Sequence, residues 1–434
     1  MSHIAVVGGG ICGLSAAIRL SQCGANTELW EVAKHPGGRT NSYFEQKTET
    51  FVDHGPHLIT GAYQATLALL REAGAESNVY LQPSLSLPLW DRNRSHFSLK
   101  PLPSLPLPIA LPISIGQMPE HGLASAIGML RLAAKLNGKV NAQISVRDWL
   151  ASIKIPDLLY RDLLEVICLG AMNEAMNTAN AASFARVLRD SFKNHDTARL
   201  GWFRAPLKQA LVDPLISLAR SSGTIIRLGS PVRSLIHENG AVAIVDREGN
   251  HHRYDKIILT LPPWQRNRLL KTGLTFETRS IVNAHFWFES DFQLPTPLIG
   301  TLGTRAHWWF DIETMHGQSN RSFRHLCAVI SADEGSINGH SGSKILLREL
   351  SELLGSSKTP LNPVHSRMII HRRATSLVHA GALPKRHSLP MQIIDAGEAP
   401  EPGQLPATIE AAVRRGERAA NIALGSEIET VYPL

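Results

Sequence analysis

The sequence predicts an α/β fold that opens with a doubly wound parallel sheet. Three observations predict it: a strand–turn–helix–strand pattern at the N-terminus, a strand-rich section at residues 224–264, and a helix near the end of the chain. Residues 4–7 form a short β-branched run, residues 14–22 carry a helical apolar pattern, and residues 27–31 are typical of a second strand. A helix between two strands in this order is a βαβ unit.

The stretch 101–136 contains the strongest apolar signals. Residues 101–119 hold no charged residue, but prolines interrupt them at Pro101, Pro103, Pro106, Pro108 and Pro112. Because proline lacks an amide donor and clashes with the preceding helical turn, we expect an extended segment and not a membrane span. Residues 123–136 predict an amphipathic helix with one apolar face, formed by Leu123, Ile127, Leu130 and Ala134. We expect that face to pack on the core, with contact to a membrane surface as the alternative.

The second half of the chain predicts mainly strands before its last helix. Strand-like runs occupy residues 224–228, 241–245 and 256–260, and aromatic strand-like runs follow at 280–288 and 306–310. Residues 405–410 then open a helix that continues to about Leu424.

The composition excludes several classes of protein. The 434 residues include 44 Lys+Arg and 37 Asp+Glu, a formal net charge of +7, and 43% are hydrophobic while 19% are charged. An average soluble domain has roughly 25% charged residues, so a disordered chain is excluded. The low charge indicates either a large core or an apolar ligand. The positive balance favours an anionic membrane surface, whereas no basic run interleaved with aromatics predicts a nucleic-acid partner.

The cysteines indicate the redox compartment. Cys12, Cys23, Cys168 and Cys327 show neither a CxxC motif nor a Cys/His metal spacing, so we expect no metal site and no disulfide framework. The first apolar run begins at Ile4 without a basic segment before it, which predicts no signal peptide. We therefore expect a cytoplasmic protein.

A glycine motif in the first turn predicts a dinucleotide site. Gly8, Gly10 and Gly13 form GxGxxG, in which glycines permit a tight turn and a close approach of pyrophosphate to the helix N-terminus. Glu31 lies 31 − 8 = 23 residues after Gly8, where a carboxylate accepts from a ribose hydroxyl and repels a 2′-phosphate. The surrounding βαβ pattern makes the motif specific.

Two further motifs favour a flavin over a nicotinamide. The turn PGGRT at residues 36–40 places Gly38 and Arg39 where the arginine can pair with a phosphate. The helix opened by residues 405–410, with Ala407 and Ile409 at its start, offers free amides to the electron-rich edge of a reduced flavin. An ordinary surface turn and an ordinary helix start are the alternatives for each motif alone.

These motifs together resemble a known superfamily. The segments VVGGGICGLSAA, LWEV, GGRT and LPATIEAAVRRGERAA are similar to the flavin-dependent amine oxidases and carotenoid desaturases. FVDHGPHLITGAYQATLALLREAG, ICLGAMN followed by SFARVLRDSF, LTLPPW and HWWFD resemble its squalene-associated branch, the hydroxysqualene dehydroxylases of bacterial hopanoid synthesis. The resemblance runs over nearly the whole chain.

The resemblance implies a discontinuous, Rossmann-like FAD-binding domain with an inserted, mixed α+β substrate domain. The FAD domain would comprise residues 1–75, 215–268 and 385–434, and the substrate domain residues 76–214 and 269–384. The positions implied to hold FAD are Gly8, Gly10 and Gly13 (pyrophosphate), Glu31 (ribose), Gly38 and Arg39 (phosphate and ribityl), Gly55, Pro56 and His57 (flavin ring), and Val232 (adenine).

One departure from the family lies before the last helix. The family usually has Gly-Asp followed by Trp-Thr, whereas this chain reads IIDAGEAP at residues 393–400. We expect Gly397 and Glu398 to replace the Gly-Asp pair, with Asp395 as the alternative to Glu398.

The resemblance implies conversion of an allylic alcohol, hydroxysqualene, to squalene. Loss of the hydroxyl needs an acid or strong donor, the allylic cation needs an apolar cavity, and reduced flavin supplies hydride. His57 is our candidate donor because imidazole titrates near neutral pH. A purely shaping role for His57 and a donor role for His54 remain open, and we expect Asp53 to order the loop. Tyr63 and Asn173 are expected on the substrate side, although spacing gives no geometry for either.

Two other functions remain open from the sequence alone. One is an oxidative member of the superfamily, a polyene desaturase or an amine oxidase. The other is a non-enzymatic flavin- or NAD-binding partner in a lipid pathway. A long-chain isoprenoid substrate predicts peripheral contact with the inner face of the cytoplasmic membrane, and no motif identifies the electron donor.

Overall fold

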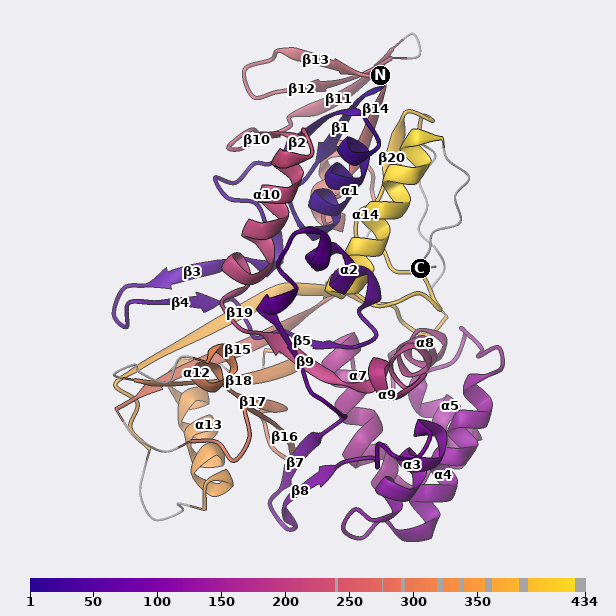
Figure 1. Cartoon of the computed structure of the whole chain (residues 1–434), viewed down its shortest axis with the longest axis vertical. Coiled ribbons are helices and arrows are strands. Elements are labelled where there is room, and N and C mark those ends of the chain that lie inside the picture. Colours follow the sequence, from indigo (N-terminus) through magenta and orange to yellow (C-terminus); the bar gives the residue numbers. More distant parts are fainter. Residues whose placement is uncertain are drawn as a thin grey trace.

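The computed structural model has two lobes stacked along its long axis (Figure 1). It describes residues 1–238, 241–274, 276–289, 293–317, 323–335, 337, 339–355, 361–381 and 389–425. Parts of the predicted FAD-domain segment 385–434, namely residues 385–388 and 426–434, lie outside the described residues.

The upper lobe is built on a five-stranded parallel sheet that gathers strands from distant parts of the chain. Its order is β10 (Ile225–Arg227), β2 (Asn26–Trp30), β1 (His3–Val7), β14 (Lys256–Leu259) and β20 (Ile393–Asp395). Parallel neighbours need crossover connections, and here most of the chain is inserted between them. The predicted α/β class with a discontinuous Rossmann-like domain is confirmed.

Both faces of this sheet are covered. Ile4 and Val6 pack with the helices α1 (Ile11–Gln22), α2 (Gln64–Glu72), α10 (Asp213–Ser221) and α14 (Ile409–Leu424). Ala5 and Val7 point to the other face, against the antiparallel strands β11 (Ser234–Glu238), β12 (Ala241–Val245) and β13 (His251–Tyr254). Successive side chains of β1 point to opposite faces of the sheet, so the strand contributes to two hydrophobic cores. The last helix ends at Leu424, as predicted.

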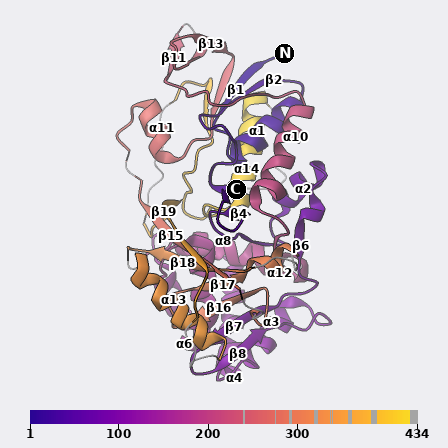
Figure 2. The same cartoon turned by 90° about the vertical axis from the view of Figure 1, so that its left-hand side faces the viewer.

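The inserted lobe contains a seven-stranded mixed sheet. Its order is β19 (His365–Ser376), β15 (Thr278–Phe288), β18 (Arg324–Asp333), β17 (Trp308–Asp311), β16 (Leu298–Leu302), β7 (Leu87–Asp91) and β8 (Ser95–Leu99). Figure 2 shows α13 (Gly339–Leu353) on the outer side of this sheet, where Phe286 and Trp309 pack with Leu346 and Leu350. The opposite face, with Trp308 and Phe310, turns inward.

Helices complete the inserted lobe beside that inner face. They are α3 (Leu107–Gly116), α4 (Gly122–Leu136), α5 (Val146–Ser152), α6 (Asp157–Leu159), α7 (Glu165–Met172), α8 (Ala181–Ser191) and α9 (His195–Ala198). The remaining elements join the lobes or edge the sheets: the turn Gly38–Thr40, β3 (Ser42–Glu45), β4 (Thr50–Asp53), β5 (Leu58–Thr60), β6 (Val79–Leu81), β9 (Leu200–Phe203), α11 (Pro263–Leu270) and α12 (Ile312–His316). Among the described helices, none is long and apolar enough to cross a bilayer.

Two expectations for residues 101–136 are wrong. The extended segment predicted at 101–119 contains the helix α3, since Pro106 precedes it, Pro108 lies in the first turn where no amide bond is needed, and Pro112 costs only one interior bond. The apolar face of α4 does not pack on the core: Leu123 and Leu130 are exposed, while the face containing Ser125 and Gly128 is buried. A Cβ at Gly128 would lie 2.6 Å from Pro156 Cδ, so α4 packs closely through its small residues.

Candidate active site

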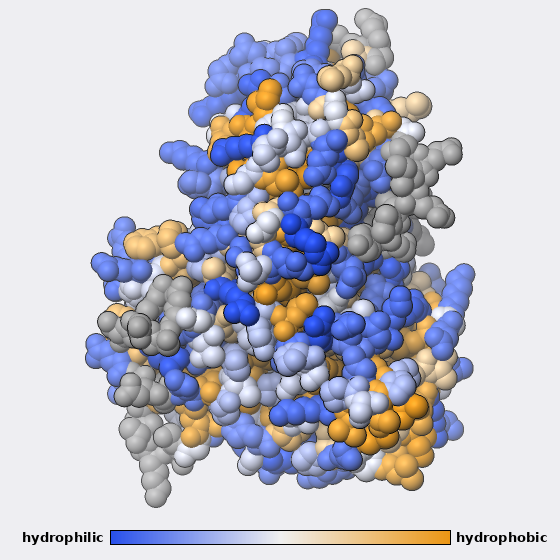
Figure 3. Space-filling model, in the orientation of Figure 1, coloured by the Kyte–Doolittle hydropathy of each residue, from blue (hydrophilic) through white to orange (hydrophobic). Residues whose placement is uncertain are grey.

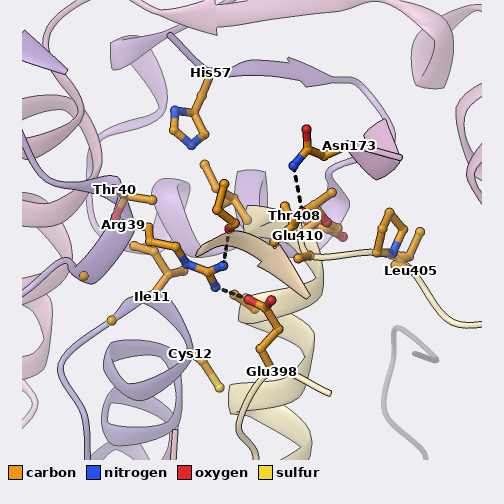
Figure 4. A pocket seen from close by; sticks show the side chains of 18 of the residues that line it. Ile11, Cys12, Arg39, Thr40, His57, Asn173, Glu398, Leu405, Thr408 and Glu410 are labelled. Carbon is orange, nitrogen blue, oxygen red and sulfur yellow. Dashed lines mark hydrogen bonds and ion pairs between the residues drawn. The ribbon is translucent and has the colours of Figure 1, made fainter. Parts of the chain in front are cut away.

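A cavity of about 1060 Å³ lies between the two lobes. Its upper part is formed by turns at the ends of the parallel strands, where an open α/β sheet places its ligands. Its lower part is formed by the inner face of the seven-stranded sheet together with α7 and α8. Figure 4 shows side chains from both lobes converging on this space.

The first turn forms a cradle at the N-terminus of α1. Gly8 has φ +111, a conformation that favours glycine, and a Cβ at Gly13 would lie 1.9 Å from Gly8 O. A Cβ at Gly10, in contrast, would meet no atom within 4 Å, because it would project into the cavity. Gly10 is the N-cap of α1 and has no side chain that could accept from the first amides of the helix. These amides therefore remain available to an anion. The cradle fits a pyrophosphate, with Gly13 allowing close packing beneath it.

Glu31 follows β2 at the upper end of the cavity. Its Oε2 accepts from Gly9 N at 2.6 Å and its Oε1 from Ala33 N at 2.8 Å, which fixes the carboxylate beside the glycine turn. Val232 also lines the cavity, two residues after Ser230, whose N donates to Glu31 O at 2.9 Å. Each oxygen retains capacity for a further donor, so this position fits a ribose hydroxyl.

Arg39 and Glu398 form an ion pair in the cavity wall. Arg39 Nη1 also donates to Ala374 O at 2.6 Å, and Glu398 Oε1 accepts from Ser376 N at 2.7 Å. Burial acts to raise the pKa of Glu398, but Arg39, Arg415 and the amide of Ser376 together outweigh it and the pKa is lowered. The pair therefore remains charged, and Figure 4 shows it spanning the space below His57.

The neighbouring Asp395 and Gly397 have different surroundings. Asp395 pairs with the buried Arg266 at 3.0 Å and also accepts from Gly397 N at 3.0 Å, away from the lining. A Cβ at Gly397 would lie 2.5 Å from Leu261 O, so this glycine permits packing behind the wall. Glu398, not Asp395, is the carboxylate that reaches the cavity.

The loop after β4 brings two histidines to the cavity. His57 Nδ1 lies 2.9 Å from Gly55 O, and burial lowers the pKa of the ring. A neutral ring that donates from Nδ1 keeps Nε2 available; in the described part of the chain no hydrogen bond to Nε2 is found. His54 also lines the cavity, and burial lowers its pKa. Pro56 lies between them in the lining.

Asp53 orders this loop, as expected. It accepts from Ser42 Oγ at 2.5 Å and from Leu207 N at 2.8 Å, and burial raises its pKa to about 7. It does not line the cavity. Gly55 lies under Asn283, since a Cβ there would be 2.6 Å from Asn283 Oδ1.

The N-terminus of α14 closes one side of the cavity. Thr408 is its N-cap and accepts from Ala411 N at 3.2 Å, while Ala407 and Ile409 line the cavity. Glu410 points to α2, where it accepts from Ala65 N at 3.0 Å and Thr66 N at 2.9 Å. The positive end of this helix therefore faces the space below His57 and fits the electron-rich edge of a flavin.

The lower part of the cavity is an apolar channel. It is lined by Leu85, Leu87, Leu99, Val166, Ile167, Ala171, Val187, Phe192, Leu200, Ile281, Trp308, Phe310 and Val329. Trp308 and Phe310 stack with ring centroids 6.2 Å apart on the inner face of β17. We define these residues as the apolar channel.

Tyr63 and Asn173 both line the cavity, and their place on the substrate side stays a prediction. Burial raises the pKa of Tyr63, so it stays a neutral donor. The amide of Asn173 is used structurally, because Nδ2 donates to Thr375 Oγ1 at 2.9 Å and Oδ1 accepts from Ala332 N at 2.6 Å. Asn173 thereby joins the end of α7 to the seven-stranded sheet.

Sequence reasoning did not select several residues of the lining. Asn283, His371, Trp308 and Phe310 come from strands of the seven-stranded sheet. Side chains alternate along each strand, so the sequence could have shown that these residues lie on one face of the sheet. Periodicity does not show that this face borders the cavity.

In the described residues, no group of three or more His, Cys, Asp or Glu side chains could hold a metal ion.

The model of the family described as "Flavin containing amine oxidoreductase" matches residues 11–424. The chain belongs to this family. It is therefore a flavin-dependent oxidoreductase, and the glycine cradle, Arg39 and the α14 N-terminus fit that cofactor.

Two relatives and one solved structure extend this finding. The chain is 28% identical to "Hydroxysqualene dehydroxylase" of Sinorhizobium fredii, with 99% of each chain covered. It is 23% identical to the protein of the same name from Zymomonas mobilis, covering 98% of this chain and 99% of the relative. Cyclohexylamine oxidase from Brevibacterium oxydans shares the fold with a TM-score of 0.70 at 16% identity, covering 98% of this chain and 99% of that one.

Proposed function

We propose that this chain is a hydroxysqualene dehydroxylase, which reduces hydroxysqualene to squalene in bacterial hopanoid biosynthesis with FAD as its flavin. The observation that carries the proposal is one cavity that joins a dinucleotide cradle to an apolar channel. The full-length relatives named for this reaction support it. A long-chain isoprenoid alcohol is the substrate that such a channel fits.

FAD, in place of a shorter flavin, is supported by the length of the site. The cradle at Gly10 and the carboxylate of Glu31 offer a pyrophosphate position and a ribose position. Val232 lines the same cavity and is proposed to meet the adenine, and the Arg39–Glu398 pair, also in the lining, is proposed to meet the phosphate and ribityl groups. A flavin without the adenylate would leave the upper end unused.

His57 is proposed to assist departure of the hydroxyl. Its Nε2 is the ring nitrogen left for a ligand, because Nδ1 is directed to Gly55 O. To act as an acid the ring must bind a proton at Nε2, and both nitrogens then donate: one to Gly55 O, the other to the leaving oxygen. Burial, which lowers the pKa of His57, makes the protonated ring a stronger acid.

The apolar channel is proposed to protect the allylic cation left by the hydroxyl. Its aliphatic side chains exclude water, which would otherwise restore the alcohol. Trp308 and Phe310 present aromatic faces, which attract cations electrostatically. The reduced flavin, when bound, supplies the hydride that completes the product, and a separate electron donor, not identified by the chain, must reduce it.

We further propose that the protein works as a peripheral protein at the inner face of the cytoplasmic membrane. The support is chemical: a long isoprenoid resides in lipid, and a formal net charge of +7 favours an anionic surface. No described helix crosses a bilayer, so contact would be at the surface.

An anaerobic turnover experiment tests the function. The flavin-loaded protein is reduced with dithionite and mixed with hydroxysqualene in detergent, while squalene is followed by mass spectrometry and flavin reoxidation by absorbance. We expect squalene and reoxidised flavin in equal amounts. The absence of both squalene and flavin reoxidation would refute the proposal.

Parallel assays with the oxidised protein separate the oxidative alternatives. Primary amines test an amine oxidase and a polyene precursor tests a desaturase. Flavin reduction by either substrate, without squalene formation from hydroxysqualene, would assign the chain to that class instead.

A further inference from the structure

The outer face of the α3–α4 hairpin, together with the segment just before α3, exposes large apolar side chains. They are Leu102 (51% exposed), Ile109 (53%), Ile113 (40%), Leu123 (75%), Ile127 (38%) and Leu130 (51%). We call these six residues the apolar patch. Figure 3 shows the hydrophobic colour gathered at the lower right, over the position of α3 and α4 in Figure 1. Contiguous exposed apolar surface of this kind marks an interaction site.

The patch is not needed to hold the two helices in place. The inner face of α3 buries Leu107, Leu111 and Ile115, while α4 buries Met129, Leu132 and Leu136 beside the closely packed Gly128. The buried faces of both helices therefore hold them in place, and the outer apolar side chains do not contribute to the hydrophobic core.

The charges around the patch are mainly basic. Residues 101–119 contribute no charge, and the basic residues Lys100, Arg131, Lys135 and Lys154 are exposed next to them in the chain or in space. Arg131 Nη1 lies 3.4 Å from Lys154 O, which brings these two residues to one side of α4. Over residues 100–157, the exposed acids are Glu120, Asp148 and Asp157. An apolar face with a basic rim is the arrangement of helices that lie in the surface of an anionic bilayer.

We propose that the apolar patch docks the protein into the surface of an anionic lipid bilayer. Leu123, Ile109 and their neighbours enter the boundary between headgroups and acyl chains, and Arg131 and Lys135 pair with lipid phosphates. The inference rests on the proposed function only in naming a lipid-borne substrate.

The position of the patch connects the bilayer to the apolar channel. Leu99 lines the channel, and the next residue, Lys100, donates from its N to Ser114 Oγ of α3 at 3.2 Å. Leu99, Leu107 and Leu111 belong to one hydrophobic cluster that also contains Trp308. The channel wall and the docking helices are therefore two sides of the same packed unit, so docking through the apolar patch would hold the bilayer next to the element that lines the channel.

Vesicle flotation of the full-length, flavin-loaded protein tests the proposal. Vesicles of phosphatidylcholine alone are compared with vesicles that also contain phosphatidylglycerol. We expect L123S/I127S/L130S to lower vesicle partitioning at least about tenfold. The matched control, I225S/I345S/I422S, removes three exposed apolar side chains elsewhere and should partition like the wild type. R131E/K135E should lower partitioning about tenfold on the anionic vesicles alone.

Equal flotation of the two triple variants, or no flotation of the wild type, would overturn the proposal. A wild-type dimer in solution that L123S/I127S/L130S converts to a monomer, without flotation, would assign the patch to self-association instead. Turnover with detergent-solubilised hydroxysqualene separates this inference from the proposed function: it should be unchanged in L123S/I127S/L130S. Absence of squalene with intact flotation would refute the function and leave the docking surface standing.

Discussion

The two ends of the cavity are built by different physical chemistry. The cradle end consists of backbone amides, tight glycines and the Arg39–Glu398 ion pair, each with one geometry that works. The channel end consists of apolar side chains from several elements, which act through volume and the exclusion of water. The first end should therefore tolerate almost no substitution, and the second should tolerate any that keeps its volume and apolar character.

Gly13→Ala should show the largest effect, at the cradle end. The added Cβ would lie 1.9 Å from Gly8 O, a backbone atom that cannot move aside, so we expect a loss of about 3 kcal/mol or more in stability and no bound flavin. Thermal unfolding and the flavin-to-protein absorbance ratio measure both quantities.

Gly10→Ala is the matched control for this substitution. Its Cβ would meet no atom of the protein, so the melting temperature should stay near that of the wild type while flavin binding falls. If Gly10→Ala bound flavin normally, the cradle would not be the pyrophosphate site.

His57→Ala should show the next effect, where the two ends meet. General acid catalysis is typically worth about 100-fold or more, so turnover of the flavin-replete variant should fall by about that factor. Because burial lowers the pKa of His57 below its ordinary 6.5, wild-type turnover should decrease as pH rises above that lowered pKa, and the variant should lack this dependence.

The same assay on His54→Ala distinguishes the two histidines. We expect this variant to keep the pH dependence of the wild type. Unchanged turnover in flavin-replete His57→Ala would remove His57 from the mechanism and leave it a role in shaping the site.

Arg39→Ala tests the ion pair. It leaves the buried Glu398 without its cation, which costs several kcal/mol for a fully buried pair. Because the Arg39 side chain is 46% exposed, solvent screening reduces this, and we expect about 1–2 kcal/mol together with weaker flavin binding. Chemical denaturation of the apoprotein and flavin titration give the two values.

The contribution of the Arg39–Glu398 pair to the stability of the fold should decrease in acid. The folded-state pKa of Glu398 is lowered, so its contribution is present above the unfolded value of about 4.3 and is lost as pH falls through the folded pKa. The stability difference between the wild type and Glu398→Gln should therefore shrink below about pH 4. A difference that grew in acid would contradict the assignment of a charged pair.

The same contrast explains how much the sequence predicts. The glycine cradle could be predicted from the sequence because Gly8, Gly10 and Gly13 determine the conformation of a turn only six residues long. The motif before the last helix also favoured Glu398 over Asp395, but the physical reason for that choice could not be read from it, because it depends on Arg39 and Arg266, which lie far away in the chain. The channel was missed for the same reason, since Trp308 and Leu87 meet only after seven strands have assembled.

The error at α4 has a different origin. Periodicity correctly identified an amphipathic helix but not which side faces the protein. The helix has two apolar faces: Met129, Leu132 and Leu136 face the core beside Gly128, which packs closely against Pro156, and the stripe with Leu123 and Leu130 faces outward. An apolar stripe is thus evidence for burial only when the helix has no second apolar face that packs better.

Trp308→Leu should show the smallest effect, at the channel end. Leucine keeps the wall apolar, so flavin binding should not change, but the aromatic face is lost. If that face stabilises a cation, turnover should fall about tenfold, within the range of cation–π energies. Trp308→Phe keeps an aromatic face and should stay within about threefold of the wild type. Stopped-flow reoxidation of flavin-loaded protein compares the two variants directly. Equal rates for leucine and phenylalanine would mean that the aromatic face is not needed and that the apolar character of the wall is enough, which would make the contrast with the cradle sharper still.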